Sequence, residues 1–379
     1  MEAVGFRMKF SIDLSAVPAK PAGAGRYAIA LASGICGAMA VSDSALLIAN
    51  SKVATFWQGL APCAEVVASV PSNRVLRLIY EQTLFERLLN KKKVEVHHGI
   101  HYTMPEGFKG AKVVTVHDMT LLEHPEWHER SKAILFKRAL VVAAKSADLL
   151  ICPSNFTADK LRNLLNPRGD VVVIYHGVDQ RGIGGGSGLS PRLPEKIVGI
   201  PYILFVGTIE PRKDLPTLLS AFERVGEKNK ELSLVIAGQI GWKSAEVIAR
   251  IEDSRLRERI FRLDYVDEAT LGALYAKASA FVYPSFEEGF GLPVLEAMRS
   301  GVPVITTKGT SMAEVARGSA LLFEPGNYEE LTAAIQSVID GTVSSEKLVA
   351  KGLEVSSDYT WEASVKAHLA VYRLAAERN

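Results

Sequence analysis

Residues 283–298 have the types and spacing of a site for a sugar joined to a diphosphate. They read YPSFEEGFGLPVLEAM, and the apolar residues 280–283 that lead into them indicate a short buried strand. Gly289 and Gly291 remove side chains in front of a helix that we expect to begin at Leu292 or Pro293, so a ligand can approach the bare backbone. The free N–H groups and the positive dipole end of such a helix attract an anion, typically a phosphate.

Two carboxylates accompany this helix start. Glu288 lies just before the turn, and Glu296 lies one turn into the helix. A carboxylate repels phosphate, so sugar hydroxyl groups are the partners that we expect for both acids. Glu296 taken alone is also compatible with an ordinary first-turn acid that the helix dipole stabilises.

Positive charge for a diphosphate comes from Arg212 and Lys213, which follow a predicted strand at residues 201–207 and precede a predicted helix at residues 216–225. Cations are unfavourable at a helix N-terminus unless an anion lies there. The alternative is a solvated pair of basic residues at a helix start.

Six of the eight histidines lie between residues 97 and 128. A predicted strand at residues 112–116 ends at His117, and the carboxyl ends of parallel strands are where open α/β sheets bind ligands. We considered a metal cluster, but no pair of histidines has i, i+4 ligand spacing in a credible metal motif. The pattern favours a neutral His117 imidazole that hydrogen-bonds a ligand hydroxyl.

Strands and helices alternate in both halves of the chain, which predicts an α/β fold with parallel sheets. The length of 379 residues favours two domains. We expect a Rossmann-like domain at residues 1–180, a Gly/Ser/Pro-rich linker at 181–200 and a second Rossmann-like domain at 201–355. The segment 356–379 is predicted to be a helix that returns to the first domain. Local patterns also predict a helix at 245–258 and a loop at 308–316.

Residues 73–93 predict a single amphipathic helix with a basic border. Its apolar positions at helical spacing are Val75, Leu76, Ile79, Leu84 and Leu88. A core helix with a solvated face is the interpretation that we favour. A helix lying on an anionic membrane is the alternative, in keeping with the mildly basic first half of the chain.

The three cysteines, Cys36, Cys63 and Cys152, are widely separated, and no CxxC spacing exists. We therefore expect neither a disulfide nor a zinc site, and a reducing cytosol as the setting. No signal peptide or membrane-spanning stretch is expected. The formal net charge of +2 gives no reason to expect nucleic acid.

The run VGTIEPRKDLPTLLSAF together with FEEGFGLPVLEAMRSGVPVITT strongly resembles the retaining nucleotide-sugar glycosyltransferases of family 4. The similarity extends over nearly the whole chain, through GAGRY, VTVHDM, CPSNFT, VIYHGVD and the final TWE helix. It implies the GT-B architecture, in which the parallel sheets of two Rossmann-like domains face each other across a cleft.

The resemblance also implies roles for individual residues. Glu296 would bind the ribose, Glu288 the donor sugar, and Lys213 with Arg212 the diphosphate. The implied catalytic residues are His117, Glu288, Lys213 and Arg212. The implied donor-binding residues are Gly23, Thr208, Tyr265, Val266, Gly289, Phe290, Gly291, Leu292 and Glu296.

The chain departs from the family pattern in the first glycine loop and at three further positions. Thr208 stands where many members have arginine, His176 where asparagine is common, and Asp264 where glycine is frequent. The departure at Thr208 puts in question how Arg212 and Lys213 share the phosphates.

The implied reaction is front-face transfer with retention, without a metal or cofactor. The GTIEPRK form resembles mannosyltransferases of surface-polysaccharide and lipopolysaccharide synthesis, so GDP-mannose is the first expected donor and a UDP-sugar the second. The UDP-sugar alternative covers glucosyl, galactosyl or N-acetylglucosaminyl transfer. A glycan or a lipid-linked acceptor is expected, with the protein cytoplasmic and peripheral on the inner membrane face. A nucleotide-sugar binding protein without transfer and an epimerase of the same fold are the rival functions.

Overall fold

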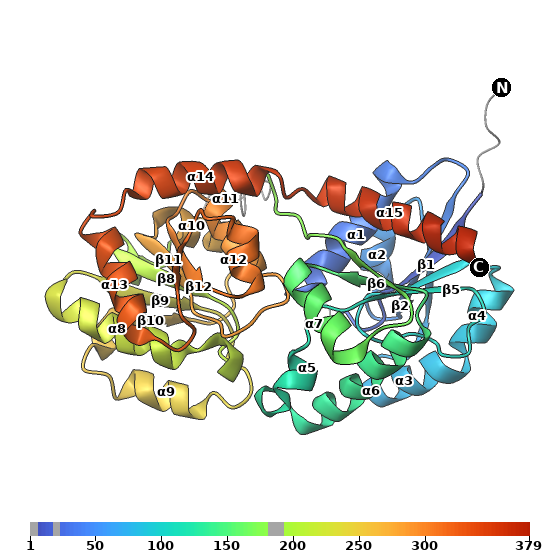
Figure 1. The fold of residues 1–379 in the computed structure, drawn as a ribbon, viewed down its shortest axis with the longest axis horizontal. Coiled ribbons are helices and arrows are strands. Elements are labelled where there is room, and N and C mark those ends of the chain that lie inside the picture. The colour runs from blue at the N-terminus through green and yellow to red at the C-terminus, as the bar shows by residue number, and fades with distance from the viewer. Residues whose placement is uncertain (1–6, 18–22, 181–192) are drawn as a thin grey trace. The chain divides into compact units, whose positions relative to one another are not determined.

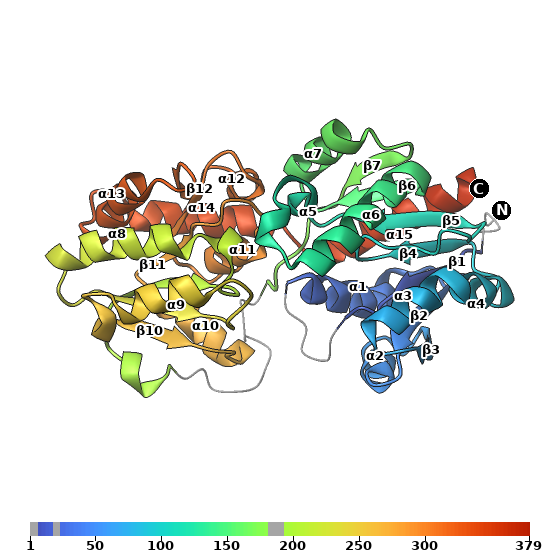
Figure 2. The ribbon, with the colours of Figure 1, turned by 90° about the horizontal axis from the view of Figure 1, so that it is seen from below.

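The computed structural model describes residues 7–17, 23–180 and 193–379. The chain divides into two compact units, each built around its own sheet. Unit 1 comprises Met1–Pro125, Arg130–Gly177 and Trp361–Asn379. Unit 2 comprises Glu126–Glu129 and Val178–Thr360. In Figures 1 and 2 the strands of each unit lie between helices, which is the layered α/β arrangement.

Unit 1 contains, within the described residues, a seven-stranded parallel sheet of order β3-β2-β1-β4-β5-β6-β7. Its strands are β1 (Lys9–Asp13), β2 (Ser44–Asn50), β3 (Glu65–Val70), β4 (Val96–Gly99), β5 (Ala111–Thr115), β6 (Leu149–Cys152) and β7 (Asp170–Val173). Its helices are α1 (Ala24–Ala38), α2 (Ala54–Leu60), α3 (Arg74–Thr83), α4 (Phe85–Lys91), α5 (Thr120–Glu123), α6 (Arg130–Ser146), α7 (Asn155–Leu165) and α15 (Trp361–Arg378). Both faces of such a sheet are covered, which explains why β4 and β6 are buried throughout.

Unit 2 contains, in the part of the chain that is described, a six-stranded parallel sheet of order β10-β9-β8-β11-β12-β13. Its strands are β8 (Tyr202–Val206), β9 (Ser233–Ala237), β10 (Ile260–Leu263), β11 (Ala280–Tyr283), β12 (Val304–Thr307) and β13 (Leu321–Phe323). Its helices are α8 (Leu215–Lys228), α9 (Ala245–Glu252), α10 (Glu268–Lys277), α11 (Leu292–Arg299), α12 (Ser311–Ala316), α13 (Tyr328–Ile339) and α14 (Ser345–Ser357).

Each sheet reverses its strand order at one place. The neighbours there are β1 and β4 in unit 1, and β8 and β11 in unit 2. Connections from such neighbouring strands leave toward opposite sides of the sheet, which opens a crevice at their carboxyl ends. The segments that follow β8 and β11 are those that carry Arg212, Lys213 and Glu288.

The last helix, α15, belongs to the core of unit 1. Val365, Leu369 and Tyr372 are at most 5% exposed and lie in one apolar cluster with residues of β1 and α1. A side chain at Gly34 of α1 would come within 2.6 Å of Val365. The absence of a side chain at Gly34 therefore lets the two helices approach closely.

Three local predictions were wrong. The single helix at 73–93 is broken at Leu84 into α3 and α4. The predicted loop at 308–316 contains the short helix α12, whose Met312 and Val315 are fully buried. The helix predicted to reach residue 258 ends at Glu252 with Asp253 as its C-cap. In each case tertiary packing, which local periodicity does not report, sets where the helix runs.

Helix α3 has its apolar face outward, so the favoured interpretation of a core helix was wrong for this segment. Val75, Leu76 and Ile79 are 64%, 55% and 54% exposed, whereas Arg77 and Glu81 are 7% and 1% exposed. Helix α4 follows the ordinary pattern, with its apolar residues turned to the core.

The expectation of no disulfide was also wrong. Cys36, near the end of α1, is bonded to Cys63 in the segment before β3. The packing of α1 beside this segment brings together two cysteines that are 27 residues apart, which spacing alone does not indicate. Across the described residues, no helix has the length and apolar character that crossing a membrane requires.

Candidate active site

Arg212 and Lys213 lie in a short 3-10 turn that separates β8 from α8. The next residue, Asp214, has a φ of 47° and is the N-cap of α8, where its carboxylate accepts a hydrogen bond from the Thr217 N–H at 3.4 Å. An acid therefore occupies the helix N-terminus, and the two cations are turned away from it. The unfavourable cation–dipole contact that the sequence suggested does not arise.

Glu288 joins both cations. Its Oε1 contacts Lys213 Nζ and its Oε2 contacts Arg212 Nη1. The three side chains are 8% to 15% exposed. Charges buried to this degree persist in proteins only when they are paired and hydrogen-bonded.

Two further residues complete this cluster. The Tyr283 hydroxyl accepts from Lys213 Nζ at 2.6 Å and donates to Glu288 Oε1 at 3.1 Å. Arg212 Nη2 donates to Glu210 Oε1 at 2.8 Å. With Arg212, Lys213, Glu210 and Glu288 all ionised, the cluster has two positive and two negative charges.

Sequence reasoning did not assign a role to Glu210 or Tyr283. The acid two residues before Arg212 was a usable signal for Glu210. Tyr283 gave a weaker one, because a tyrosine at the end of a buried strand must find a hydrogen-bond partner.

The charges within the cluster decide the protonation of Glu288. Burial by itself raises the pKa of a carboxyl group, but the charges of Arg212 and Lys213 outweigh burial and lower the pKa of Glu288 to about 2. Burial lowers the pKa of Lys213, against the opposing effect of Glu288. We take the pair as ionised, because Glu288 accepts from two cations and a phenol at once.

The turn before α11 is held by backbone geometry and one hydroxyl. Helix α11 begins at Leu292, the first of the two predicted starts, with Gly291 as its N-cap at a φ of 90°. A Cβ on Gly291 would lie 2.6 Å from Met312 Cγ, so both conformation and space select glycine. Ser311 Oγ donates to the Glu288 carbonyl at 2.6 Å and fixes the approach to the turn.

The other predicted donor-binding residues of unit 2 lie on separate segments. Glu296 is 4% exposed and its Oε2 accepts from the Tyr275 hydroxyl at 3.0 Å. Thr208 is half-buried just after β8. Tyr265, 60% exposed, and Val266 follow β10, the edge strand of the sheet. Phe290 is buried against Tyr359, with ring centroids 6.0 Å apart.

His117 and Gly23 lie in unit 1. Nε2 of His117 lies 2.7 Å from the Ile100 carbonyl oxygen and must donate to it. Burial lowers the pKa of His117, opposed by this hydrogen bond, so the ring is neutral and Nδ1 is left as an acceptor. Gly23 is the exposed N-cap of α1 at a φ of 51°, and the space where its Cβ would lie is open.

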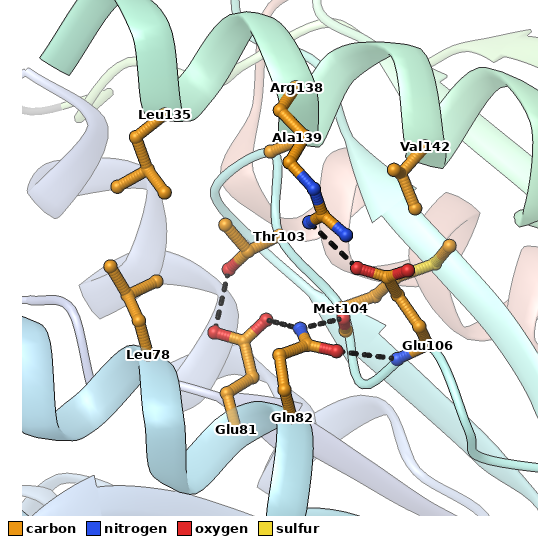
Figure 3. Close-up of a pocket in the computed structure, with 10 residues that line it drawn as sticks. All are labelled: Leu78, Glu81, Gln82, Thr103, Met104, Glu106, Leu135, Arg138, Ala139 and Val142. Carbon is orange, nitrogen blue, oxygen red and sulfur yellow. Dashed lines mark hydrogen bonds and ion pairs between the residues drawn. The ribbon is translucent and has the colours of Figure 1, made fainter.

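A pocket of about 70 Å³ lies within unit 1 between α3 and α6 (Figure 3). Leu78, Leu135 and Val142 give it apolar walls. Glu81 lies at its polar side, where the Thr103 hydroxyl donates to the carboxyl oxygen at 3.0 Å. Burial, reinforced by Asp13, raises the pKa of Glu81 to about 8. This contact with the β4–β5 segment explains why the polar side of α3 faces inward.

No three His, Cys, Asp or Glu side chains in the described part of the chain are grouped as a metal site.

Comparison with known proteins identifies the family. Residues 194–355 match the model of group 1 glycosyl transferases, and residues 51–181 match that of glycosyltransferase family 4. The O-antigen chain mannosyltransferase B of Escherichia coli is 31% identical over 297 residues, which cover 76% of each chain. This chain belongs to the glycosyltransferase family that these proteins define.

Solved glycosyltransferase structures share the fold. The sucrose-phosphate synthase of Thermosynechococcus elongatus matches with a TM-score of 0.75 at 18% identity and covers 98% of this chain and 100% of its own. HepE of Anabaena, in complex with UDP and glucose, matches with a TM-score of 0.69 at 18% identity, covering 96% and 98%. The predicted GT-B class of the fold is therefore confirmed.

Proposed function

We propose that this glycosyltransferase moves a mannosyl group, with retention, from GDP-mannose to a glycan or lipid-linked acceptor in surface-polysaccharide synthesis. One observation carries the proposal: the cluster of Arg212, Lys213 and Glu288 at the carboxyl ends of β8 and β11. The name of the Escherichia coli relative supports mannose as the sugar. The UDP and glucose in the HepE structure keep a UDP-sugar as the second choice.

The cluster suits a diphosphate that gains charge as it leaves. In the proposed step the bond between the anomeric carbon and the phosphate oxygen breaks, and its electron pair goes to the diphosphate. The acceptor hydroxyl bonds to the anomeric carbon on the same face, and its proton passes to the departing phosphate. Arg212 and Lys213 stabilise the new negative charge, and for this purpose they take the place of a divalent metal.

Glu288 changes partner in this scheme. In the structure it is paired with both cations, so an arriving diphosphate competes with it for Lys213 and Arg212. The carboxylate is then available to accept hydrogen bonds from hydroxyl groups of the donor sugar. Glu288 thus holds the cations in place until the diphosphate binds.

The remaining roles follow from hydrogen-bonding capacity. We assign Glu296 to the ribose, since a carboxylate accepts from two adjacent hydroxyls, and Tyr265 with Val266 to the base. His117 offers its bare Nδ1 to a hydroxyl of the sugar, and the open space at Gly23 admits the ligand.

A thermal-shift screen followed by product analysis tests this function. GDP, and then GDP-mannose, should raise the melting temperature more than UDP, ADP and their sugars at equal concentration. GDP should be released from GDP-mannose with and without EDTA, and the product should keep the donor's anomeric configuration. Tight binding without release of GDP would favour a binding protein, and a changed sugar still attached to its nucleotide would favour an epimerase.

We further propose that the exposed face of α3 lies on an anionic membrane that carries the acceptor. Val75, Leu76 and Ile79 of α3 are more than half exposed, and Ile134 of α6 is 75% exposed. Monomeric proteins rarely expose such a group of large apolar side chains without a binding partner. Arg87 of α4 is exposed as well, and Arg138 of α6, which pairs with Glu106 at 2.8 Å, is 64% exposed; exposed basic side chains suit anionic head groups.

Vesicle flotation tests the membrane contact. Leu76→Ser with Ile79→Ser should reduce binding to vesicles containing phosphatidylglycerol on the order of tenfold, because two apolar side chains no longer enter the interface. The matched control is Leu164→Ser on α7, which is 45% exposed and should leave binding unchanged. Equal binding by all three proteins would contradict this assignment, whatever the result for the sugar donor.

A further inference from the structure

A continuous chain of hydrogen bonds runs through the interior of unit 1. It joins Tyr372 and His368 of α15 to Tyr27 of α1, His98 of β4 and Thr115 of β5. Each of the five side chains is at most 1% exposed. The two contacts made by α15 link residues that are 274 and 341 positions apart in sequence.

The direction of the chain follows from its fixed end. His368 Nδ1 lies 2.7 Å from the Ser364 carbonyl oxygen, which can only accept, so Nδ1 carries the proton. Burial lowers the pKa of His368 to about 4, so the ring is neutral and Nε2 is bare. Tyr27, whose hydroxyl oxygen lies 2.8 Å from Nε2, must therefore donate to it.

The donor in each of the other hydrogen bonds follows in turn. Tyr27 has used its one proton, so Thr115 donates to the Tyr27 oxygen at 3.0 Å. Thr115 has then used its own proton, so His98 Nε2 donates to Thr115 Oγ1 at 2.8 Å. Burial, with neighbouring imidazoles, lowers the pKa of His98, so its Nδ1 is bare and accepts from Tyr372 at 2.6 Å. Only one arrangement of protons satisfies every contact.

His117 lies beside this chain of hydrogen bonds. Thr115 is the last residue of β5 and lies two residues before His117, and Ile100, whose carbonyl accepts from His117 Nε2, lies two residues after His98. The Tyr27 ring meets the His117 ring edge-on, with centroids 5.6 Å apart. Tyr27 also lies one turn after Gly23, the N-cap of α1.

We propose that His368 and Tyr372, on the last helix of the chain, are positioning residues for His117 and for the start of α1. The proposal rests on the proposed function of His117. His368 sets the direction of the Tyr27 hydroxyl and, through Thr115, of the His98 ring, and Tyr372 donates to the remaining nitrogen of His98. They thereby fix Tyr27, which packs on the His117 ring, and Thr115 and the segment at Ile100, which precede His117 and accept its hydrogen bond respectively (Figure 1 shows α15 with α1 and β5).

Imidazole nitrogen NMR on the full-length protein tests the direction of the chain. His98 should carry its proton on Nε2 and His368 on Nδ1 at pH 7.5, a pair of opposite tautomers. Finding either ring in the other tautomer, or protonated on both nitrogens, would overturn the proposal without any reference to activity.

Kinetics with the preferred nucleotide-sugar test the positioning role. Tyr372→Phe and Tyr27→Phe remove one hydroxyl each and keep the ring. Each should lower kcat on the order of tenfold or more through misplacement of His117. KM for the donor should stay within about twofold, since binding groups in unit 2 are untouched. Tyr27→Phe should also convert His98 to a mixture of tautomers, because Thr115 then no longer donates to Tyr27 and can donate to His98 Nε2 instead.

The matched control is Tyr202→Phe, a buried tyrosine of unit 2 whose hydroxyl donates to the Leu274 carbonyl at 2.8 Å. It should lose stability like the other two variants but keep kcat. If all three variants keep kcat within about twofold, the positioning role is wrong. If instead the wild-type protein itself transfers no sugar, the proposed function is wrong. This outcome differs from active variants with unchanged kcat, so the two failures are distinguished.

Discussion

Unit 2 holds its central groups in their charged forms, whereas unit 1 holds its central groups neutral. In unit 2, two cations keep the pKa of Glu288 at about 2. In unit 1, burial raises the pKa of Tyr27, lowers that of His368 to about 4 and raises that of Glu81 to about 8. Both sets of groups are buried, so the difference lies in pairing: Glu288 contacts two cations closely, Glu81 has one more distant arginine at 3.7 Å, and no acid is hydrogen-bonded to Tyr27 or His368 among the described contacts.

This difference matches two tasks of a transferase. A leaving diphosphate gains negative charge, and fixed cations stabilise that charge most where water is excluded. A sugar ring is neutral, and hydroxyl groups are oriented by neutral donors and acceptors with defined proton positions. The charged cluster lies at the reversal of strand order between β8 and β11, and the neutral chain includes β4, next to the reversal between β1 and β4.

The largest expected effect comes from removing one charge from unit 2. Lys213→Met keeps the length of the side chain and leaves Glu288 with Arg212 alone. We expect kcat to fall about 10²- to 10³-fold, the usual cost of losing one preorganised group at a developing negative charge. The measurement is release of nucleoside diphosphate from the donor.

Lys308→Met is the control for that loss. Lys308 pairs with Glu324 at 2.9 Å on the surface of the same unit, and its replacement should leave kcat unchanged. Comparable activity in the two variants would show that the buried charge of Lys213 is structural only.

A second prediction uses pH to separate two kinds of neutral group in unit 1. The folded-state pKa of His368 is lowered, so its contribution to stability is present above about pH 6.5 and is lost as the pH falls toward 4. The folded-state pKa of Glu81 is raised, so its contribution is present below about pH 4.5 and is lost as the pH rises through 8.

Replacing each group by glutamine removes its titration. When the pH falls from 7.5 to 5, the unfolding free energy of the wild-type protein should fall by about 2 kcal/mol relative to that of His368→Gln. Over the same change it should rise by about 3 kcal/mol relative to that of Glu81→Gln. Hydrogen exchange of amides in β4 and β5 reports on unit 1 by itself. Slopes of the same sign for both variants would show that the two groups are not both held neutral.

The smallest effect concerns competition between Glu288 and the diphosphate. Glu288→Gln removes the charge that neutralises Lys213 and Arg212, so binding of the free nucleoside diphosphate should tighten roughly tenfold, about one charge-assisted interaction. Binding of the nucleotide-sugar should gain less, because the sugar loses a carboxylate partner. Calorimetric titration of both ligands measures this. Weaker binding of the free diphosphate would mean that Glu288 does not compete with it.

The elements that depend on short apolar runs and on glycine and proline were predictable from the sequence. The strands β8 and β11, the start of α11 at Leu292 and the parallel α/β architecture follow from local periodicity and from the conformations open to glycine and proline. The proximity of Arg212, Lys213 and Glu288 was an inference from strand ends, because parallel strands place their carboxyl ends at one edge of a sheet.

Contacts between distant segments were not predictable. The inverted face of α3 arises because Glu81 bonds to Thr103, a residue 22 positions away, and the helical periodicity of α3 contains no sign of that partner. The bond between Cys36 and Cys63 depends on how α1 packs beside the segment before β3. The six histidines between residues 97 and 128 suggested a ligand site at His117, with a metal as the discounted alternative, and not a neutral chain of hydrogen bonds.

The sequence by itself determined which elements form, which family motifs follow the strands, and that cations, acids and bare backbone would meet at one sheet edge. These are properties of local conformation and of parallel sheet geometry. Only the tertiary structure decided that Glu288 neutralises both cations and that the last helix fixes the tautomers of His98 and His368. Protonation and pairing depend on burial and on partners brought from far along the chain, and neither exists before the chain is folded.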